Sequence, residues 1–406
     1  MLLKFDAPKF VISRLNDLGR TEDICLSPDN KKIALVGYQK NKLLILNIDK
    51  INALPAKKIY IKDCIEVLST SFKNPHGVAW INNEVIVVAN RLGGAFLLKI
   101  PPNKEDVINN QIWLTPIRIL PKVSIKENLS IDCVEVNIIS TNLCEILLCS
   151  NNGNYISSHL INLAENYDLE SSSILLKKNI DVPDGVAISN CKRWIAVSNH
   201  DDNSIFVYRN QKSLTPFSPP EAILNGTKFP HGIKFIGDSH YLFVSDAGSP
   251  FVNLYYSESG EWSGNHSPII SFRVLDEEAF QKGHVNPQEG GVKGIDFVKE
   301  SFIIVTTCQE QKLAFFDLSK AIDDAGINNT IKQLKPTAMS LDDYFYRATK
   351  TMLLTQRLII DESSTMLAYY RTELERVIAS KSWKVTFPLR VINKKIKKIK
   401  CFLLKF

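Results

Sequence analysis

Short apolar runs alternate with polar turns along most of the chain, and one arrangement of them recurs. Residues 182–189 read Val-Pro-Asp-Gly-Val-Ala-Ile-Ser, and residues 74–80 and 229–235 repeat the order of turn, polar residue, glycine and short apolar run. Each copy is followed, after a brief turn, by a second apolar run, such as residues 194–199. Runs of this length between turn residues predict β-strands.

Three degenerate copies begin near residues 21, 131 and 292, so the unit occurs about six times at intervals of roughly fifty residues, a period typical of propeller blades. Most copies continue into a third run, and fourth runs follow at 58–61, 223–224 and 269–272. The pattern predicts an all-β fold, a six-bladed β-propeller over residues 1–322. The last unit lacks a fourth run, and we expect residues 9–13 to close the ring as its outer strand.

The pattern changes after residue 322. Residues 323–340 are polar and predict a linker, and residues 341–406 predict a helical extension. Ser340 is a candidate helix cap, because acids follow it in the first turn. We expect one helix over 344–360, an interruption at the polar residues 361–364, and a second helix over 366–380. Beyond residue 380 the chain is basic and amphipathic.

Composition narrows the function classes. The formal charge is +6, and residues 381–406 contain no acidic residue, so much of the excess is in the tail. Because the excess positive charge is confined to the tail, the sequence argues against nucleic-acid binding. The chain shows no secretory signal and no apolar run long enough to span a bilayer, so we expect a cytoplasmic protein whose eight cysteines are buried thiols.

The residue that precedes each motif glycine, or takes its place in the degenerate copies, is polar and ionisable. Inner strands of a propeller converge on its axis, so we expect these side chains to face the channel mouth; they are Glu22, His76, Asp132, Asp184, His231 and Lys293. Glu22, Asp132 and Asp184, with His76 and His231 next, are candidate ligands for Ca²⁺ or another divalent metal. The alternative is a polar, hydrated axis in which these groups pair with one another. His200 is interpreted as part of a hairpin turn, and the long loop 276–291 as functional or mobile.

The repeats resemble those of NHL, YVTN and gluconolactonase (regucalcin-like) six-bladed propellers. Pro183-Asp184-Gly185 matches a motif of the gluconolactonase family, whereas Glu22 and Asp132 match only by their place in the repeat. The resemblance implies a metal at the channel mouth and a metal-dependent hydrolase or lactonase as one candidate function. The family's glutamate and Pro-Asn-Gly motifs are absent, and no catalytic residue can be assigned from the sequence.

The tail carries a second resemblance. Residues 380–390, Ser-Lys-Ser-Trp-Lys-Val-Thr-Phe-Pro-Leu-Arg, are similar to the SxSWxxTxPLR ending of many bacterial glycosyltransferases and surface-polysaccharide proteins, with phenylalanine where a small residue is usual. Apolar positions 392, 396, 399 and 403 then share one helix face. The tail predicts peripheral binding to an anionic membrane surface or packing on a partner helix; the remaining alternative is a solvated basic tail without a partner. The membrane residues would be Trp383, Phe387, Arg390, Lys394, Lys395, Lys397, Lys398 and Lys400.

Taken together, the sequence favours a non-enzymatic propeller scaffold or recognition module. The tail would hold it at the cytoplasmic membrane face, with a protein partner such as a glycan-assembly enzyme. The hydrolase is the alternative.

Overall fold

The computed structural model describes residues 2–52, 58–101, 107–124, 130–164, 166–237, 239–284, 286, 288–298, 301–325 and 339–379. The chain divides into two compact units, Met1–Thr355 and Gln356–Phe406.

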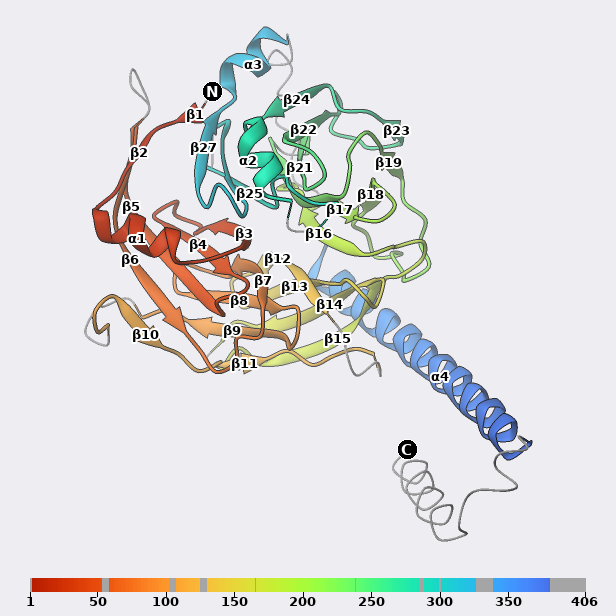
Figure 1. Cartoon of the computed structure of the whole chain (residues 1–406). Coiled ribbons are helices and arrows are strands. Elements are labelled where there is room, and N and C mark those ends of the chain that lie inside the picture. Colours follow the sequence, from red (N-terminus) through yellow and green to blue (C-terminus); the bar gives the residue numbers. More distant parts are fainter. Residues whose placement is uncertain are drawn as a thin grey trace. The chain divides into compact units, whose positions relative to one another are not determined.

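The first unit is a six-bladed β-propeller, as the repeat pattern predicts (Figure 1). In each blade, antiparallel strands follow one another from the axis outward, because turns of two to six residues join the first three strands. The first blade in chain order is built from β3 (Thr21–Leu26), β4 (Lys32–Gly37), β5 (Lys42–Asn52) and β6 (Lys58–Leu68). The second is built from β7 (Pro75–Trp80), β8 (Val85–Asn90), β9 (Gly94–Lys99) and β11 (Arg118–Ile119). The third is built from β12 (Ile131–Ser140), β13 (Leu143–Ser150), β14 (Tyr155–Asn162) and β15 (Leu169–Leu176).

The remaining blades repeat this order. They are built from β16 (Pro183–Ile188), β17 (Trp194–Asn199), β18 (Ser204–Arg209) and β19 (Ala222–Leu224); β20 (Pro230–Ile236), β21 (Tyr241–Asp246), β22 (Phe251–Tyr256) and β24 (Ile270–Arg273); and β25 (Gly294–Phe297), β26 (Ile303–Thr307), β27 (Ala314–Asp317) and β1 (Leu2–Leu3). Three short strands extend blade edges: β2 (Phe5–Asp6) and β10 (Gln111–Trp113) pair with β6, and β23 (Gly264–His266) pairs with β19.

The ring closes through the N-terminus, but the expected strand at residues 9–13 is wrong. Leu2–Leu3 pairs antiparallel with β27, whereas Lys9–Asn16 forms helix α1. The carbonyl oxygen of Pro8, the N-cap residue, accepts the first hydrogen bond of α1 from the amide of Ile12. Val11 and Leu15, four residues apart on one helix face, are buried in the core between blades one and six. The short apolar run was compatible with either structure, and in the helix Val11 and Leu15 are buried while Phe10 and Ile12 are exposed.

Six apolar clusters fill the interfaces between successive blades. Ile33 and Leu35 of blade one share a cluster with Val305 and Phe315 of blade six, and each further pair of adjacent blades has a cluster of its own. Because every blade buries both faces, its central strands are apolar at nearly every position rather than alternating.

The motif glycines allow the inner strands to approach one another around the axis. A Cβ atom at Gly77 would lie 2.7 Å from the carbonyl oxygen of Asp132, and one at Gly232 would lie 2.6 Å from that of Lys293. At Gly294 it would lie 2.7 Å from the Cα atom of Asp23, across the closure between blades six and one. The glycine of the repeat is therefore a packing requirement between blades.

Three further helices complete the described fold. They are α2 (Glu277–Lys282), capped by the Asp276 carboxylate, α3 (Ser319–Asp324) and α4 (Leu341–Ala379). The Ser340 hydroxyl accepts a hydrogen bond from the Asp343 amide, as its predicted capping role requires. Among the described helices, none combines the length and apolar character needed to cross a bilayer.

The expected interruption of the last helix at residues 361–364 is wrong, because α4 continues through it. The hydroxyls of Ser363 and Thr365 donate to the carbonyl oxygens of Ile359 and Asp361, four residues back, so these polar side chains are satisfied within the helix. The basic tail from residue 380 onward lies outside the described residues.

Candidate functional site at the channel mouth

The six predicted channel residues all lie at the propeller axis and all are buried. Five of them sit at irregularities in the pairing of the inner strand with the second strand. The register shifts between Pro75 and Gly77 and between Pro183 and Gly185, so His76 and Asp184 have no cross-strand partner. Glu22, Asp132 and His231 lie in equivalent shifts. A bulge of this kind redirects one side chain, here toward the axis.

Glu22 is the most enclosed of the six, and two cations face it. Arg20 forms an ion pair with it, and Lys293 Nζ lies 3.1 Å from its Oε2. Burial alone would raise the pKa of Glu22, but Lys293 and Arg20 hold that pKa below its usual value. Glu22 is therefore a buried carboxylate anion compensated by side chains of blades one and six.

His76 and His231 stack beside Glu22, with ring centroids 5.3 Å apart. Burial, with Arg91 nearby, lowers the pKa of His76 well below its usual value, and burial with Lys293 does the same for His231. The Nδ1 atom of His76 lies 2.8 Å from the carbonyl oxygen of Asp132, which can only accept, so Nδ1 carries the proton. Nε2 of His76 then presents a lone pair toward Glu22 Oε2, 3.6 Å away.

Asp132 and Asp184 form a carboxyl pair apart from Glu22. Burial and the neighbouring Asp184 raise the pKa of Asp132 to about 8. Arg91 lies 3.3 Å from Asp132, and the Asn151 amide donates to Asp184 at 2.6 Å. Asp132 is therefore protonated at neutral pH, which limits the repulsion between the two carboxyl groups.

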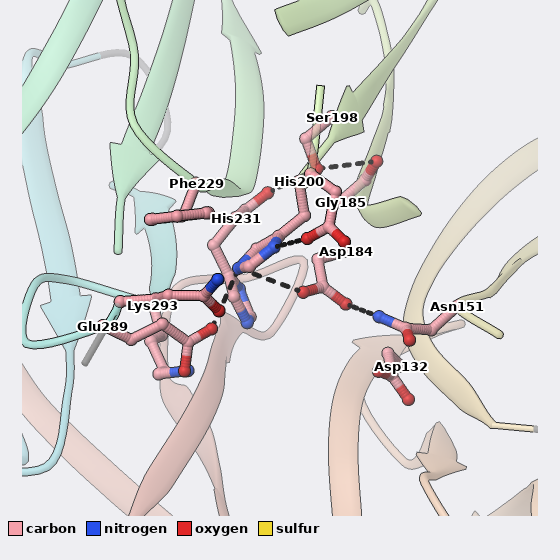
Figure 2. Close-up of polar contacts among 12 residues, drawn as sticks. Asp132, Asn151, Asp184, Gly185, Ser198, His200, Phe229, His231, Glu289 and Lys293 are labelled. Atoms are coloured by element: carbon pink, nitrogen blue, oxygen red, sulfur yellow. Dashed lines mark hydrogen bonds and ion pairs between the residues drawn. The ribbon is translucent and has the colours of Figure 1, made fainter. Parts of the chain in front are cut away.

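Two residues that the sequence did not assign to the channel complete the site. The Nε2 atom of His200 lies 2.9 Å from Glu289 Oε1 and 3.8 Å from Asp184 Oδ2 (Figure 2). Burial would lower the pKa of His200, but Glu289 and Asp184 raise it to about 9. The Glu289 carboxylate, at the end of the predicted long loop, also accepts from Lys293 Nζ at 2.8 Å. The functional interpretation of loop 276–291 was the one signal that pointed to Glu289.

The structure divides the predicted metal ligands between two groups. Ligand atoms of Glu22, His76 and His231 all lie within 4.8 Å of one another, and those of Asp184, His200 and Glu289 form a second such group. Asp132 belongs to neither among the described residues. In the first group, neither Nε2 has a hydrogen-bond partner in the described part of the chain.

A buried histidine elsewhere makes stability depend on pH. Burial lowers the pKa of His159, on β14, to about 4. Its imidazole ring forms hydrogen bonds with the hydroxyls of Ser157 and Ser172. An unfolded histidine titrates near 6.5, so the unfolded state takes up the proton first as the pH falls. The stabilisation is complete above about pH 6.5 and is lost toward pH 4. Between pH 7 and pH 5 this single group should cost about 2 kcal/mol of unfolding free energy.

Urea unfolding at the two pH values, for the wild type and for His159→Gln, measures this difference. Glutamine keeps a polar group beside both serines without titrating. The variant should lose about 2 kcal/mol less than the wild type between pH 7 and pH 5. An equal loss in both proteins would contradict the assignment.

No protein-family model matches the chain, and no curated protein matches it in sequence. Solved structures match in fold. A chain of a nidogen/laminin complex is 10% identical with a TM-score of 0.43, covering 62% of this chain and 80% of that one. A luciferin-regenerating enzyme is 11% identical with a TM-score of 0.47, covering 72% and 86%. Neither match carries information on activity. The fold places the chain in the class of six-bladed β-propellers.

Proposed function

We propose that the protein is a non-enzymatic propeller scaffold or recognition module in the assembly of cell-surface polysaccharide at the cytoplasmic membrane face. The observation that carries this proposal is the internal pairing of the axial charges. Lys293 bridges Glu22 and Glu289, Arg91 faces Asp132, and each of these carboxylates is at least nine-tenths buried. A substrate would have to displace these ion pairs, so we place recognition on other surfaces.

The membrane part of the proposal rests on the tail sequence. The string at residues 380–390 is similar to the ending of bacterial surface-polysaccharide proteins, and five lysines follow it between positions 394 and 400. Each lysine near an anionic surface contributes about 1 kcal/mol, and the apolar face at 392, 396, 399 and 403 adds burial. The partner would be a glycan-assembly enzyme at the same membrane.

Co-sedimentation with phosphatidylglycerol vesicles tests this role. The comparison is between the full chain and a truncation after Ala379, because a cut before α4 would also remove Tyr344 and Arg347, which are buried in the first unit. The full chain should bind at low salt and weaken as salt rises, since the Debye length is about 8 Å at physiological ionic strength. A full-length variant with glutamine at positions 394, 395, 397, 398 and 400 should bind no better than the truncation. Equal binding by full chain and truncation, or none by either, would contradict the membrane role.

A metal-dependent hydrolase or lactonase is the second candidate, and the arrangement of Glu22, His76 and His231 favours it. A ligating histidine commonly donates its other ring N–H to a backbone carbonyl, as His76 does. Two imidazoles and one carboxylate suit a transition metal such as Zn²⁺ or Mn²⁺ better than Ca²⁺, which prefers six or more oxygen ligands. The ammonium group of Lys293 opposes a further cation at Glu22.

Elemental analysis and equilibrium titration with Zn²⁺, Mn²⁺ and Ca²⁺ decide between the candidates. For the hydrolase, we expect one transition metal per chain, lost in His231→Gln and retained in Asp184→Asn. A panel of lactones and phosphoesters then tests turnover. Protein that stays metal-free at saturating concentrations of all three ions would remove the hydrolase and leave the scaffold.

A further inference from the structure

The ammonium group of Lys293 lies among side chains that would otherwise suit a metal ion. Its Nζ atom is 3.1 Å from Oε2 of Glu22 and 2.8 Å from Oε2 of Glu289. The same Glu22 oxygen lies 3.6 Å from Nε2 of His76 and 3.9 Å from Nε2 of His231. All five residues are buried. One lysine and two imidazoles therefore converge on a single carboxylate oxygen at the propeller axis.

Glu22, His76 and His231 by themselves have the composition and spacing of a zinc site. Two histidines and one glutamate are a known zinc ligand set. Ligand atoms about 2.1 Å from a tetrahedral zinc ion stand about 3.4 Å from one another, which is close to the two distances from the Glu22 oxygen. Neither histidine Nε2 atom has a hydrogen-bond partner among the described residues, so both are available as ligand atoms.

The charges around Glu22 are already balanced without a metal. Arg20 forms an ion pair with Glu22, and its Nη2 atom lies 3.6 Å from Oε2 of Glu289. Lys293 contacts the same two carboxylates, so two cations offset two anions. A divalent ion added beside Glu22 would bring two uncompensated positive charges into a buried site that already holds the ammonium group, which is strongly unfavourable.

We propose that the ammonium group of Lys293 is the resident cation of this site and takes the place of a metal ion. Glu22 belongs to β3 of blade one, and Lys293 directly precedes β25 of blade six. The tethered ammonium group therefore joins these two blades at the closure of the ring, and the junction needs no metal. The inference rests on the proposed non-enzymatic function, since a metal-dependent hydrolase would need the position that Lys293 occupies.

Removing the ammonium group should create a metal site, which calorimetric titration of the full chain with Zn²⁺ detects. Lys293→Met should bind one zinc ion per chain at least about 100-fold more tightly than the wild type, because the charge repulsion is gone. Lys293→Met/His231→Gln should lose this site, because a ligand is missing. Lys234→Met is the matched control. It removes an inner-strand ammonium group 2.7 Å from Glu135, which belongs to neither group of candidate ligands, and should gain no zinc.

Thermal unfolding gives a second readout. Zinc should raise the Tm of Lys293→Met and leave that of the wild type unchanged, since only the variant binds it. EDTA should not lower the wild-type Tm. If Lys293→Met does not fold, Lys293→Gln, which keeps a hydrogen-bond donor beside Glu22, is titrated in its place with the same expectation.

Three results would overturn the proposal. They are wild-type zinc binding as tight as that of the Lys293 variant, a wild-type Tm lowered by EDTA, and a folded Lys293 variant that gains no more zinc than Lys234→Met. Stoichiometric zinc in the wild type together with turnover of a lactone would remove the non-enzymatic function as well. A wild type and a folded Lys293 variant that both stay free of metal would remove only the tethered cation.

Discussion

Replacing Arg347 with alanine is expected to lower the free energy of unfolding of the propeller unit by about 3–5 kcal/mol, the cost of leaving a buried charge without its partner. Arg347 is 2% exposed and forms an ion pair with Glu145, which is fully buried on β13. The same guanidinium donates to Asn210 and lies 4.9 Å from the ring of Tyr344. One substitution therefore removes contacts between α4 and two blades.

The expected loss of unfolding free energy is large because the substitution leaves the buried Glu145 carboxylate with few partners. Without Arg347, the Glu145 carboxylate keeps hydrogen bonds from Ser158 at 2.6 Å and from Asn137 at 3.4 Å, but no cation. Arg347→Lys should recover only part of the loss, because lysine cannot bridge Asn210 and Glu145 as the planar guanidinium does.

Urea unfolding at neutral pH measures the change, and a double-mutant cycle isolates its cause. Arg347→Ala/Glu145→Ala should be more stable than Arg347→Ala alone, because the second substitution removes the unpaired anion. Arg376→Ala is the matched control, since that arginine is exposed and should cost less than about 0.5 kcal/mol. A loss below about 1 kcal/mol for Arg347→Ala would show that α4 is not held by this ion pair.

The repeat made the propeller and its axial residues predictable. A polar residue followed by glycine and an apolar run is a local pattern, and fold symmetry then brings every copy to the same axis. Six of the residues at the channel mouth were found this way. His200 and Glu289 could not be found from the repeat. His200 reaches the axis from the end of β17, the second strand of its blade, and Glu289 from the long loop 276–291. Their placement depends on tertiary packing that no repeat encodes.

The errors have the same origin at both ends of the chain. Residues 9–13 and 361–364 were interpreted from local composition alone. In the structure, residues 9–13 belong to a helix that buries Val11. The last helix continues through residues 361–364, where the Ser363 hydroxyl bonds to the carbonyl oxygen of Ile359. The amphipathic pattern of the last helix was likewise visible, but which face would be buried was not. Its docking face is polar because Glu145 and Asn210 on the blades offer charged and amide partners.

Replacing Gly185 with alanine is the second large effect we expect, a loss of about 3 kcal/mol in unfolding free energy, at the upper end for overpacking. The added Cβ would overlap the carbonyl oxygen of His231 and lie 2.8 Å from the Ser198 hydroxyl. Ser198 in turn donates to that carbonyl at 3.0 Å, so the two blades are joined at this point. A backbone atom cannot rotate away as a flexible side chain can, and blades four and five would have to separate.

Gly93→Ala is the control for this substitution. A Cβ there would have its nearest neighbours at 3.4 Å, so alanine fits and should change stability by no more than about 0.5 kcal/mol. Gly294→Ala makes the same test at the closure of the ring, where the Cβ would lie 2.7 Å from the Cα atom of Asp23. If the glycines are required at every junction, Gly185→Ala and Gly294→Ala should both lower the urea midpoint clearly below that of Gly93→Ala. A Gly185→Ala protein as stable as the control would mean that adjacent blades can move apart at the axis without cost, and the motif glycine would need another explanation.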